Sequence, residues 1–294
     1  MSSLREVKDR IASVRSTLKI TSAMKLVASS KLRKAQRTIE SLRPYEEALS
    51  HILSSLQGSA PAVAMPAGEE PEDAFAAEEK PARTVVVAVS SNTSMCGAFN
   101  ANVIKLALET VRSISGAVEV WSFGRKMTDA FRKEGMPAAR DFSGLVAHPS
   151  SDGLAAVSRE LREMYEDGRI SGVVLVYSHF VSTGRQVAVR ERFLPFEGFA
   201  PGTAEAGRDD GLYILEPSGE ELLLGMVSQV LDLKLYAAIL DSAAAEHAAR
   251  MVAMQAATDN AQDLLSQLTL EYNKGRQQKI TSEILDLVAG ENRN

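Results

Sequence analysis

The sequence is poor in features that mark secreted or membrane-spanning proteins. Cys96 is the single cysteine, so the chain cannot form an internal disulfide and gives no sign of an oxidising compartment. No run approaches the roughly 18 apolar residues of a membrane helix. The N-terminal stretch lacks the apolar core of a signal peptide, and Glu6 and Asp9 are untypical of a transit peptide. These absences favour a cytosolic chain without a membrane span of its own.

Aromatic residues are scarce as well, at 5 %, while 45 % of the 294 residues are hydrophobic. This composition, rich in Ala, Leu, Glu and Arg, favours helices over a β-sandwich or barrel. Charge is unevenly spread along the chain. Residues 1–43 hold eleven Lys or Arg against three Asp or Glu, a balance of +8 that leaves −13 for the remainder of a chain of net charge −5. Such a basic arm predicts an acidic protein partner or another polyanionic surface.

Motifs of catalysis and ligand binding are missing too. The segment Ser90–Phe99 lies where a phosphate-binding loop would lie, after a first strand and before a helix, but it has neither GxxxxGK[ST] nor GxGxxG. No His or Asp pattern around Cys96 points to a nucleophile. The histidines show no metal-ligand spacing; they are His51, His148, His179 and His247. His247 lies at a helix-seam position, which indicates a structural role. We therefore expect no catalytic residue, cofactor or metal.

The N-terminal segment, residues 2–56, carries the pattern of a coiled-coil helix. Leu4, Val7, Ile11, Val14 and Leu18 recur at alternating spacings of three and four, which is a coiled-coil seam. The seam continues at Thr21, Lys25, Ala28, Leu32, Ala35, Ile39, Leu42 and Leu49, and it loosens around Thr21–Ala28. A second apolar stripe, Ile20, Met24 and Val27, lies on another face. The first proline is Pro44, and about 55 helical residues would span roughly 80 Å.

The C-terminal segment, residues 212–290, repeats this pattern over about 75 residues, or roughly 110 Å of helix. Its seam runs through Leu233, Ala237, Leu240, Ala244, His247, Met251, Met254, Thr258, Ala261, Leu265, Leu268 and Tyr272. The register slips near Gly275, and we expect Ile280, Ile284 and Leu287 to resume it. The alanine-rich stretch Ala237–Ala261 predicts close helix approach and an outer surface of low relief. To pair, the two terminal helices must run antiparallel.

Between these helices the pattern alternates strand and helix. Buried-strand runs are expected at Thr84–Ser90, Ala117–Phe123 and Gly172–His179, and an edge strand at Gln186–Pro195. Helices are expected at Asn100–Ser113, Lys126–Glu134 and Ser151–Asp167. This order predicts right-handed crossovers and a mostly parallel sheet, hence a Rossmann-like α/β domain.

The predicted fold class is therefore α/β, a long antiparallel coiled coil joined to a Rossmann-like domain. Its parts are an N-terminal coiled-coil helix (1–57), an acidic linker (58–83), the α/β domain (84–211) and a C-terminal coiled-coil helix (212–294). The linker holds Pro61, Pro66, Pro71 and Pro81 among Ala and Glu. It is either a solvated loop or a regulatory element.

Four ordered blocks give the chain a family resemblance. LREVKDRIASVRSTLKITSAMKLVASSKLRKAQ (Leu4–Gln36), SSNTSMCGAFNANVIK (Ser91–Lys105), AEHAARMVAMQAATDNA (Ala245–Ala261) and YNKGRQQKITSEILDLVAG (Tyr272–Gly290) resemble the F-type ATP synthase gamma subunit. Two local departures are Asn92–Met95, where the family usually has Asp, a basic residue, Gly and Leu, and Glu291, where it usually has Ala after the glycine. The missing transit peptide and chloroplast-type insertion favour a bacterial source.

The resemblance implies a non-catalytic central rotary shaft that couples ion-driven rotation of a membrane ring to the catalytic beta subunits. Its implied partners are the alpha, beta and epsilon subunits and the ring of c subunits, on the cytoplasmic face of the bacterial inner membrane, with peripheral attachment only. Shaft contacts to alpha and beta are implied at Met24, Lys25, Arg250, Gln277 and Thr281. Contacts of the foot with the ring are implied at Tyr213 and Glu216, within YILEP (Tyr213–Pro217).

Three other readings compete with this one. A coiled-coil scaffold or tether would share the long helices but would not require two apolar faces. A nucleotide-dependent enzyme would use the α/β domain but should show a phosphate loop. Nucleic-acid binding would use the basic N-terminal helix, which lacks interleaved aromatic residues and any known DNA-binding pattern, so no nucleic-acid partner is expected. Without the resemblance, Lys25 would be read as a snorkelling lysine of an ordinary coiled coil.

Overall fold

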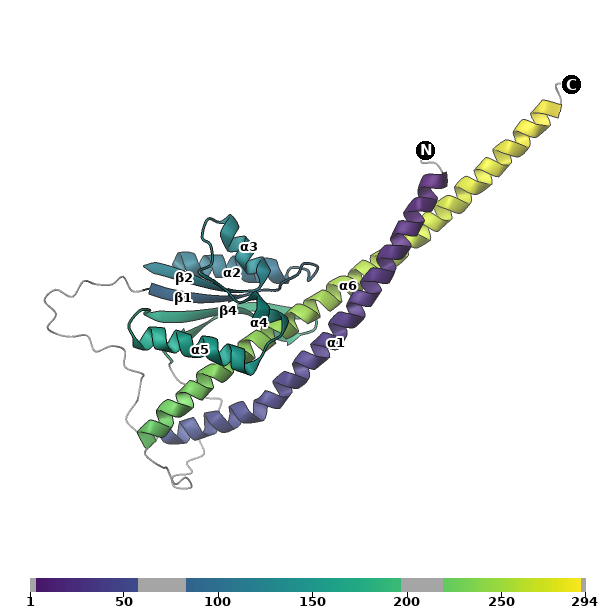
Figure 1. Ribbon diagram of the computed structural model, residues 1–294. Helices are drawn as coiled ribbons and strands as arrows, with labels where there is room; N and C mark the ends of the chain where they lie inside the picture. The colour runs from purple at the N-terminus through teal and green to yellow at the C-terminus, as the bar shows by residue number, and fades with distance from the viewer. Residues whose placement is uncertain (1–3, 58–82, 197–218, 292–294) are drawn as a thin grey trace. The chain divides into compact units, whose positions relative to one another are not determined.

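The structure, a computed structural model, describes residues 4–57, 83–196 and 219–291 (Figure 1). Its contacts divide the chain into two units. The first, here called the two-helix unit, comprises Met1–Ser30 and Arg250–Asn294. The second, the α/β unit, comprises Lys31–Ala249. The long helices α1 (Leu4–Gln57) and α6 (Gly219–Glu291) each contribute to both units.

A five-stranded sheet forms the centre of the α/β unit, in the order β3-β2-β1-β4-β5. Strands β1 (Arg83–Val89), β2 (Ala117–Phe123), β3 (Arg140–Asp141) and β4 (Gly172–Ser182) are parallel. Strand β5 (Arg185–Leu194) pairs antiparallel with β4 at the edge. The predicted mostly parallel sheet with an edge strand is thus confirmed.

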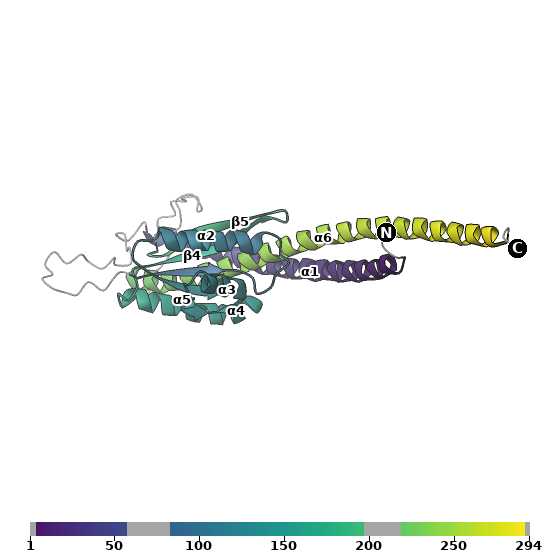
Figure 2. The same cartoon turned by 90° about the horizontal axis from the view of Figure 1, so that it is seen from above.

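Helices cover both faces of this sheet, and β1 shows why its sequence is continuously apolar. Val85, Val87 and Val89 face the side covered by α5 (Ser151–Glu166) and α6. Val86 and Ala88 face α2 (Phe99–Ser113) and α3 (Arg125–Lys133). Because both faces are dry, each residue of the run must be apolar. Figures 1 and 2 show α2 and α5 on opposite sides of the sheet.

The end of β2 approaches β1 closely at a position that only glycine allows. Gly124 has a φ of +109°, and a Cβ there would lie 2.2 Å from the carbonyl oxygen of Ser90. This approach lets the Ser90 hydroxyl accept a hydrogen bond of 2.8 Å from the N–H of Met127, in the first turn of α3. The start of α3 is thereby fixed to the end of β1.

The ends of the predicted elements of the middle region differ from the observed ends by at most three residues. Two short elements were missed: β3 and the one-turn helix α4 (Ser143–Ala147). Neither has enough residues to show a period. β3 exists because Arg140 and Asp141 pair with Trp121 and Ser122 of β2, a contact that the local sequence does not encode.

The alanine-rich part of α6 departs from the prediction. We expected these alanines to leave a smooth outer surface, but Ala244, Ala245, Ala248 and Ala249 are all buried within the chain. Ala245 and Ala249 pack against Cys96 and Phe99 of the α/β unit. Small side chains let the helix lie close to this loop, so here they serve internal packing.

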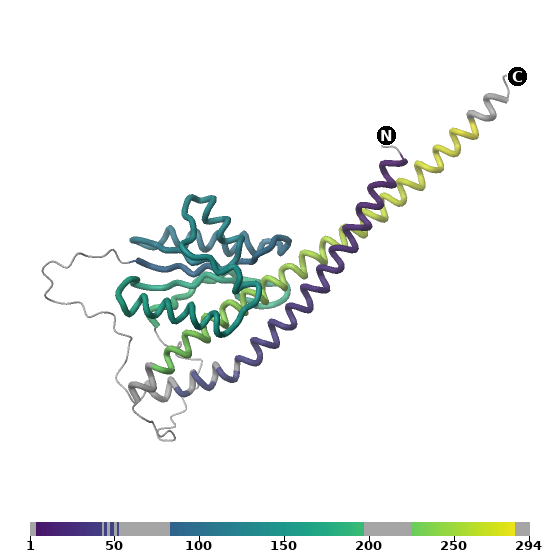
Figure 3. Tube along the Cα trace, in the orientation of Figure 1, coloured from purple at the N-terminus to yellow at the C-terminus, as the bar shows by residue number. Residues whose placement is uncertain are grey.

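In the two-helix unit the helices run antiparallel, as predicted, and lie side by side (Figure 3). Leu4 lies against Gly275, and Thr21 accepts a hydrogen bond of 2.9 Å from Thr258. Each step along α1 toward its C-terminus is thus matched by an equal step along α6 toward its N-terminus. The seam of α1 is confirmed: between Leu4 and Thr21 its less exposed residues are the seam positions alone.

The last predicted stretch of the α6 seam is wrong where it can be checked. Ile280 and Ile284 are about half exposed, and the side chain of Leu287 lies outside the described residues. Since Leu4, in the first described turn of α1, meets Gly275, these isoleucines lie past the point where α1 offers a surface.

Within the described ranges, no helix combines the length and apolar character needed to cross a bilayer. Of the predicted linker 58–83, only Arg83 is described, where it opens β1; residues 212–218 of the predicted C-terminal helix also lie outside the described residues. The division at these boundaries stays a proposal.

Candidate partner interface

The space beside the loop after β1, considered above for nucleotide binding, is occupied by side chains of the protein itself. In a doubly wound sheet a ligand binds at the carboxyl ends of the strands where the strand order reverses, here between β1 and β4. Cys96 and Phe99 follow β1, Phe180 lies near the end of β4, and α6 places Ala245 and Ala249 against them. Side chains of α6 thus occupy the place beside the loop where such a ligand would lie.

The same loop is held by hydrogen bonds within the chain. Asn100 accepts bonds from the N–H (3.1 Å) and hydroxyl (3.0 Å) of Ser91, and its amide nitrogen lies 3.1 Å from the Cys96 sulfur. Cys96 is buried and is not placed as an accessible nucleophile. In the parts of the chain that the structure describes, no group of three or more His, Cys, Asp or Glu could hold a metal ion.

Among the described residues, Asp141 is a carboxyl with a shifted pKa, and its contacts are local ones just before a helix. Burial raises the pKa of Asp141, yet hydrogen bonds from the hydroxyl and N–H of Ser143, with smaller contributions from Thr128 and the charge of Arg125, hold that pKa below its usual range. Asp141 lies two residues before Ser143, the first residue of α4, so its carboxylate accepts one of the backbone N–H groups that the helix start leaves without an intrahelical partner.

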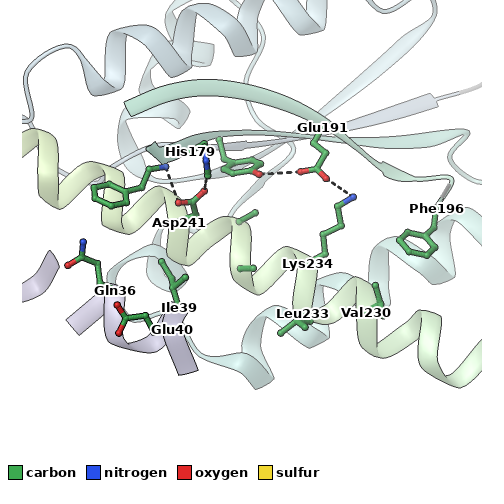
Figure 4. A pocket seen from close by; sticks show the side chains of 14 residues that line it. Gln36, Ile39, Glu40, His179, Glu191, Phe196, Val230, Leu233, Lys234 and Asp241 are labelled. Atoms are coloured by element: carbon green, nitrogen blue, oxygen red, sulfur yellow. Dashed lines mark hydrogen bonds and ion pairs between the residues drawn. The ribbon is translucent and has the colours of Figure 1, made fainter. Parts of the chain in front are cut away.

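A cavity of about 600 Å³ lies in the α/β unit beside α6 (Figure 4). Its walls come from α1 (Gln36, Ile39 and Glu40), the β4–β5 hairpin and α6. His179, which sequence reasoning left without a role, lies in this wall with its Nδ1 2.6 Å from the carboxylate of Asp241. The cavity has a mainly apolar lining, and its polar pairs join the β4–β5 hairpin to α6, His179 with Asp241 and Glu191 with Lys234.

The two-helix unit, by contrast, exposes large apolar side chains outside its seam. They are between 45 % and 71 % exposed and come from both helices: Ile20, Leu26, Val27, Val252, Leu264, Leu270, Ile280, Ile284 and Leu285. The predicted second stripe is therefore real at Ile20 and Val27, while Met24 is half-buried. Exposed large apolar side chains on both helices of this unit indicate a surface that partners cover.

A shallow hollow of about 300 Å³ lies on this unit, formed by both helices. Lys25, Leu26 and Ser29 line it from α1, and Met251, Val252 and Gln255 from α6. Lys25 crosses the seam to donate a hydrogen bond of 2.8 Å to Gln255, which in turn donates one of 2.8 Å to Asp259. The ammonium is thereby held beside the apolar residues of the hollow.

The five predicted shaft contacts do not form one cluster. Met24, Lys25 and Arg250 are half-buried, and Arg250 has a partner within the chain. Gln277 and Thr281 are exposed, one turn apart, and the Thr281 hydroxyl donates to the Gln277 carbonyl at 2.9 Å. Both lie beyond Gly275. The predicted foot residues, Tyr213 and Glu216, lie outside the described residues.

Sequence reasoning missed Leu26, Val252 and Gln255, and a signal was available only for the first two. Leu26 and Val252 are apolar residues outside the seam, and the antiparallel register that pairs Thr21 with Thr258 places Gln255 opposite Lys25. That register is set by the tertiary structure.

Comparison with known proteins identifies the family of the chain. The sequence model of a family described as ATP synthase matches residues 3–292. The ATP synthase gamma chain of Bacteroides fragilis is 44 % identical over 295 residues, covering 99 % of both chains, and that of Bacteroides thetaiotaomicron is 43 % identical over 303 residues with the same coverage. The chain belongs to the ATP synthase gamma chain family.

The fold agrees with this membership. A chain from the rotor of the Euglena gracilis mitochondrial ATP synthase superposes with a TM-score of 0.64 at 19 % identity, covering 94 % of this chain and 98 % of that one. At this identity the likeness concerns the fold alone. As a gamma chain, the protein is a non-catalytic subunit. In agreement with this, α6 packs against the loop after β1.

Proposed function

We propose that this gamma chain is the central rotary shaft of an F-type ATP synthase and that its two-helix unit turns inside a ring of alpha and beta subunits. The observation that carries the proposal is the set of large apolar side chains exposed on both helices of that unit. A free two-stranded coiled coil needs apolar residues only along its seam. A shaft enclosed by partner subunits also needs them on its outer surface.

Charge adds to the proposal. In α1, Lys8, Arg15 and Lys19 are exposed at spacings of seven and four, which places them on one side of the helix. None of them pairs with a described residue; the exposed pair Arg10–Glu6, at 3.6 Å, is a local contact within the helix. A row of free cations favours acidic surfaces on the enclosing subunits and steers their association.

Within the shaft surface, Met24, Lys25, Arg250, Gln277 and Thr281 are the proposed contacts to alpha and beta. The hollow at Lys25 adds Leu26 and Val252, which are exposed beside the held ammonium. An apolar side chain of a beta subunit would enter this hollow and a carboxylate would meet Lys25. Tyr213 and Glu216 remain the proposed contacts of the foot with the ring of c subunits.

The mechanism follows from an asymmetric surface. As the shaft turns, each beta subunit meets a different face and is biased toward one conformation, so its nucleotide affinity changes with angle. Moving a two-state equilibrium from 1:99 to 99:1 takes about 5.5 kcal/mol of differential contact. The catalytic residues belong to alpha and beta. The proposed partners are the alpha, beta and epsilon subunits and the c ring. The proposed location of the chain is the cytoplasmic face of a bacterial inner membrane, to which it is attached peripherally.

Co-purification tests this function directly. The tagged chain would be isolated from its native membranes and the bound proteins identified by mass. We expect alpha, beta and epsilon in fixed ratio, with more alpha and beta than gamma. Recovery of the chain alone, or with unrelated proteins, would contradict the shaft function and favour a coiled-coil scaffold or tether.

A further inference from the structure

We propose that three polar ties hold α6 in one rotational and axial register within the α/β unit, and that Asp241 is the principal positioning residue among them. The inference rests on the proposed shaft function, because a shaft transmits torque only if its helix cannot twist within the domain that carries it. The polar ties are Arg162–Asp232, Lys234–Glu191 and the contacts of Asp241 with β4.

Each tie joins α6 to a different element. The guanidinium of Arg162 on α5 lies 3.1 Å from Asp232. Lys234 lies 2.8 Å from Glu191 on β5 and donates a further bond of 3.2 Å to the carbonyl of Arg192. The hydroxyl of Tyr177 donates to Glu191 at 3.2 Å, which fixes that carboxylate from the neighbouring strand.

The Asp241 tie uses both carboxylate oxygens. One accepts a hydrogen bond of 2.9 Å from the backbone N–H of Phe180, and the other lies 2.6 Å from Nδ1 of His179 (Figure 4). Both groups belong to β4, beyond its last pairing with β1. A backbone donor cannot change rotamer, so this contact fixes the position of the helix more strictly than a pair of long side chains does.

The ties lie on opposite sides of the helix. Asp241 lies nine positions after Asp232, about two and a half turns, so the two carboxylates point in opposite directions around the axis. Lys234 lies on the same side as Asp241, within about 20° of it when projected along the axis. Twisting α6 either way therefore stretches contacts on both sides, whereas ties on a single side would let the helix roll.

Apolar packing is non-directional, so it specifies the register of α6 less sharply than these polar contacts do. On the sheet side α6 presents Leu231, Leu235, Ala238 and Ile239, a surface that could meet the same neighbours after a small rotation. On the side of Lys234 and Asp241 the cavity of about 600 Å³ interrupts the packing. Hydrogen bonds have a defined donor, acceptor and angle, so here they set the register.

The test uses the complete ATP synthase in membrane vesicles and compares Asp241→Ala with the unchanged protein. Two readouts are taken per assembled complex: the ratio of ATP-driven ion pumping to ATP hydrolysis, and the width of thermal rotational fluctuations of a probe on the α/β unit with the catalytic ring fixed. We expect a lower ratio and broader fluctuations, because losing the Asp241 contacts favours twisted states by about tenfold. Asp241→Asn, which keeps an acceptor for the Phe180 N–H, should fall in between.

Two control variants separate register from stability. Glu163→Ala removes an exposed carboxylate from α5 and should change neither readout. Val103→Ala opens the core on the opposite face of the sheet, so it should lower stability and leave both readouts unchanged. A wild-type ratio and fluctuation width in assembled Asp241→Ala complexes would overturn the inference.

If Asp241→Ala prevents assembly, Lys234→Met takes its place. It removes the Glu191 tie, keeps the length of the side chain, and should move both readouts in the same direction; unchanged readouts would again overturn the inference. Failure of the unchanged chain to assemble with alpha and beta would instead contradict the proposed shaft function itself.

Discussion

Replacing the exposed apolar stripe of α1 separates the chain's own stability from its binding to partners. Ile20 and Val27 are 59 % and 57 % exposed, so the chain itself uses less than half of each side chain. Full burial of such a side chain is worth about 1.5–3 kcal/mol. The exposed share leaves about 1–1.5 kcal/mol for a partner to gain at each position, or about 2–3 kcal/mol together.

The double variant Ile20→Ser/Val27→Ser should therefore bind the alpha–beta ring about 30- to 150-fold more weakly. Its own unfolding free energy should change by less than about 1 kcal/mol, since surface substitutions cost about 0.5 kcal/mol each. Binding is measured by titrating the labelled gamma chain into purified alpha–beta ring. Stability is measured by circular dichroism during urea unfolding.

The matched control is Ala12→Ser/Ala23→Ser, which introduces the same hydroxyls at exposed positions of the same helix without removing a large apolar group. Its affinity should remain within about fivefold of the unchanged chain, because two surface changes of about 0.5 kcal/mol each alter an equilibrium by about fivefold at most. Equal affinities for the two double variants would refute the idea that the stripe is a partner surface. A large loss of stability in Ile20→Ser/Val27→Ser would show that the stripe packs within the chain.

Three further predictions concern the chain itself. Gly275→Ala should slow amide exchange around residue 275: helix propensity gains up to about 1 kcal/mol, while the new Cβ, 3.1 Å from the flexible end of Leu4, forces only a small shift. Phe131→Ala should lower the unfolding free energy by about 3–5 kcal/mol in urea titrations, because Phe131 is fully buried. Asp141→Asn should lower the melting temperature slightly at pH 7. The loss of unfolding free energy should be less than about 1 kcal/mol, since Asp141 is largely exposed. Because folding lowers the pKa of Asp141, its contribution to stability is fully present above the unfolded value near 3.9 and is lost as pH falls through the folded pKa. The difference in melting temperature between the variant and the unchanged chain should therefore shrink below about pH 4.

Much of the fold could be predicted because the deciding information is local. The alternation of three and four from Leu4 to Leu18 identifies the buried side of α1, and the structure confirms it. The run Val85–Val89 has five consecutive apolar residues, which require a strand covered on both faces. In each case the period of the sequence reports which side of an element avoids water, whatever the neighbour is.

The candidate interface could be predicted only in part. The stripe Ile20–Val27 was recognisable because it is apolar and off the seam, but the pairing of Lys25 with Gln255 depends on how far α6 is shifted along α1. Residues 230 positions apart in sequence carry no local pattern that links them. The family resemblance supplied the contacts at Gln277 and Thr281, which stay proposals.

The sequence by itself determined which residues are turned inward on each helix and strand, since periodicity depends only on local geometry. The tertiary structure decided what each inward or outward face meets. The alanines of α6 pack on the Cys96 loop, where a smooth outer surface was expected. Ile284 follows the helical pattern yet stays exposed, because α1 offers it no surface. Asp241 gains its role only when α6 is laid beside β4. Such pairings depend on chain topology, which joins distant segments that no repeat in the sequence connects.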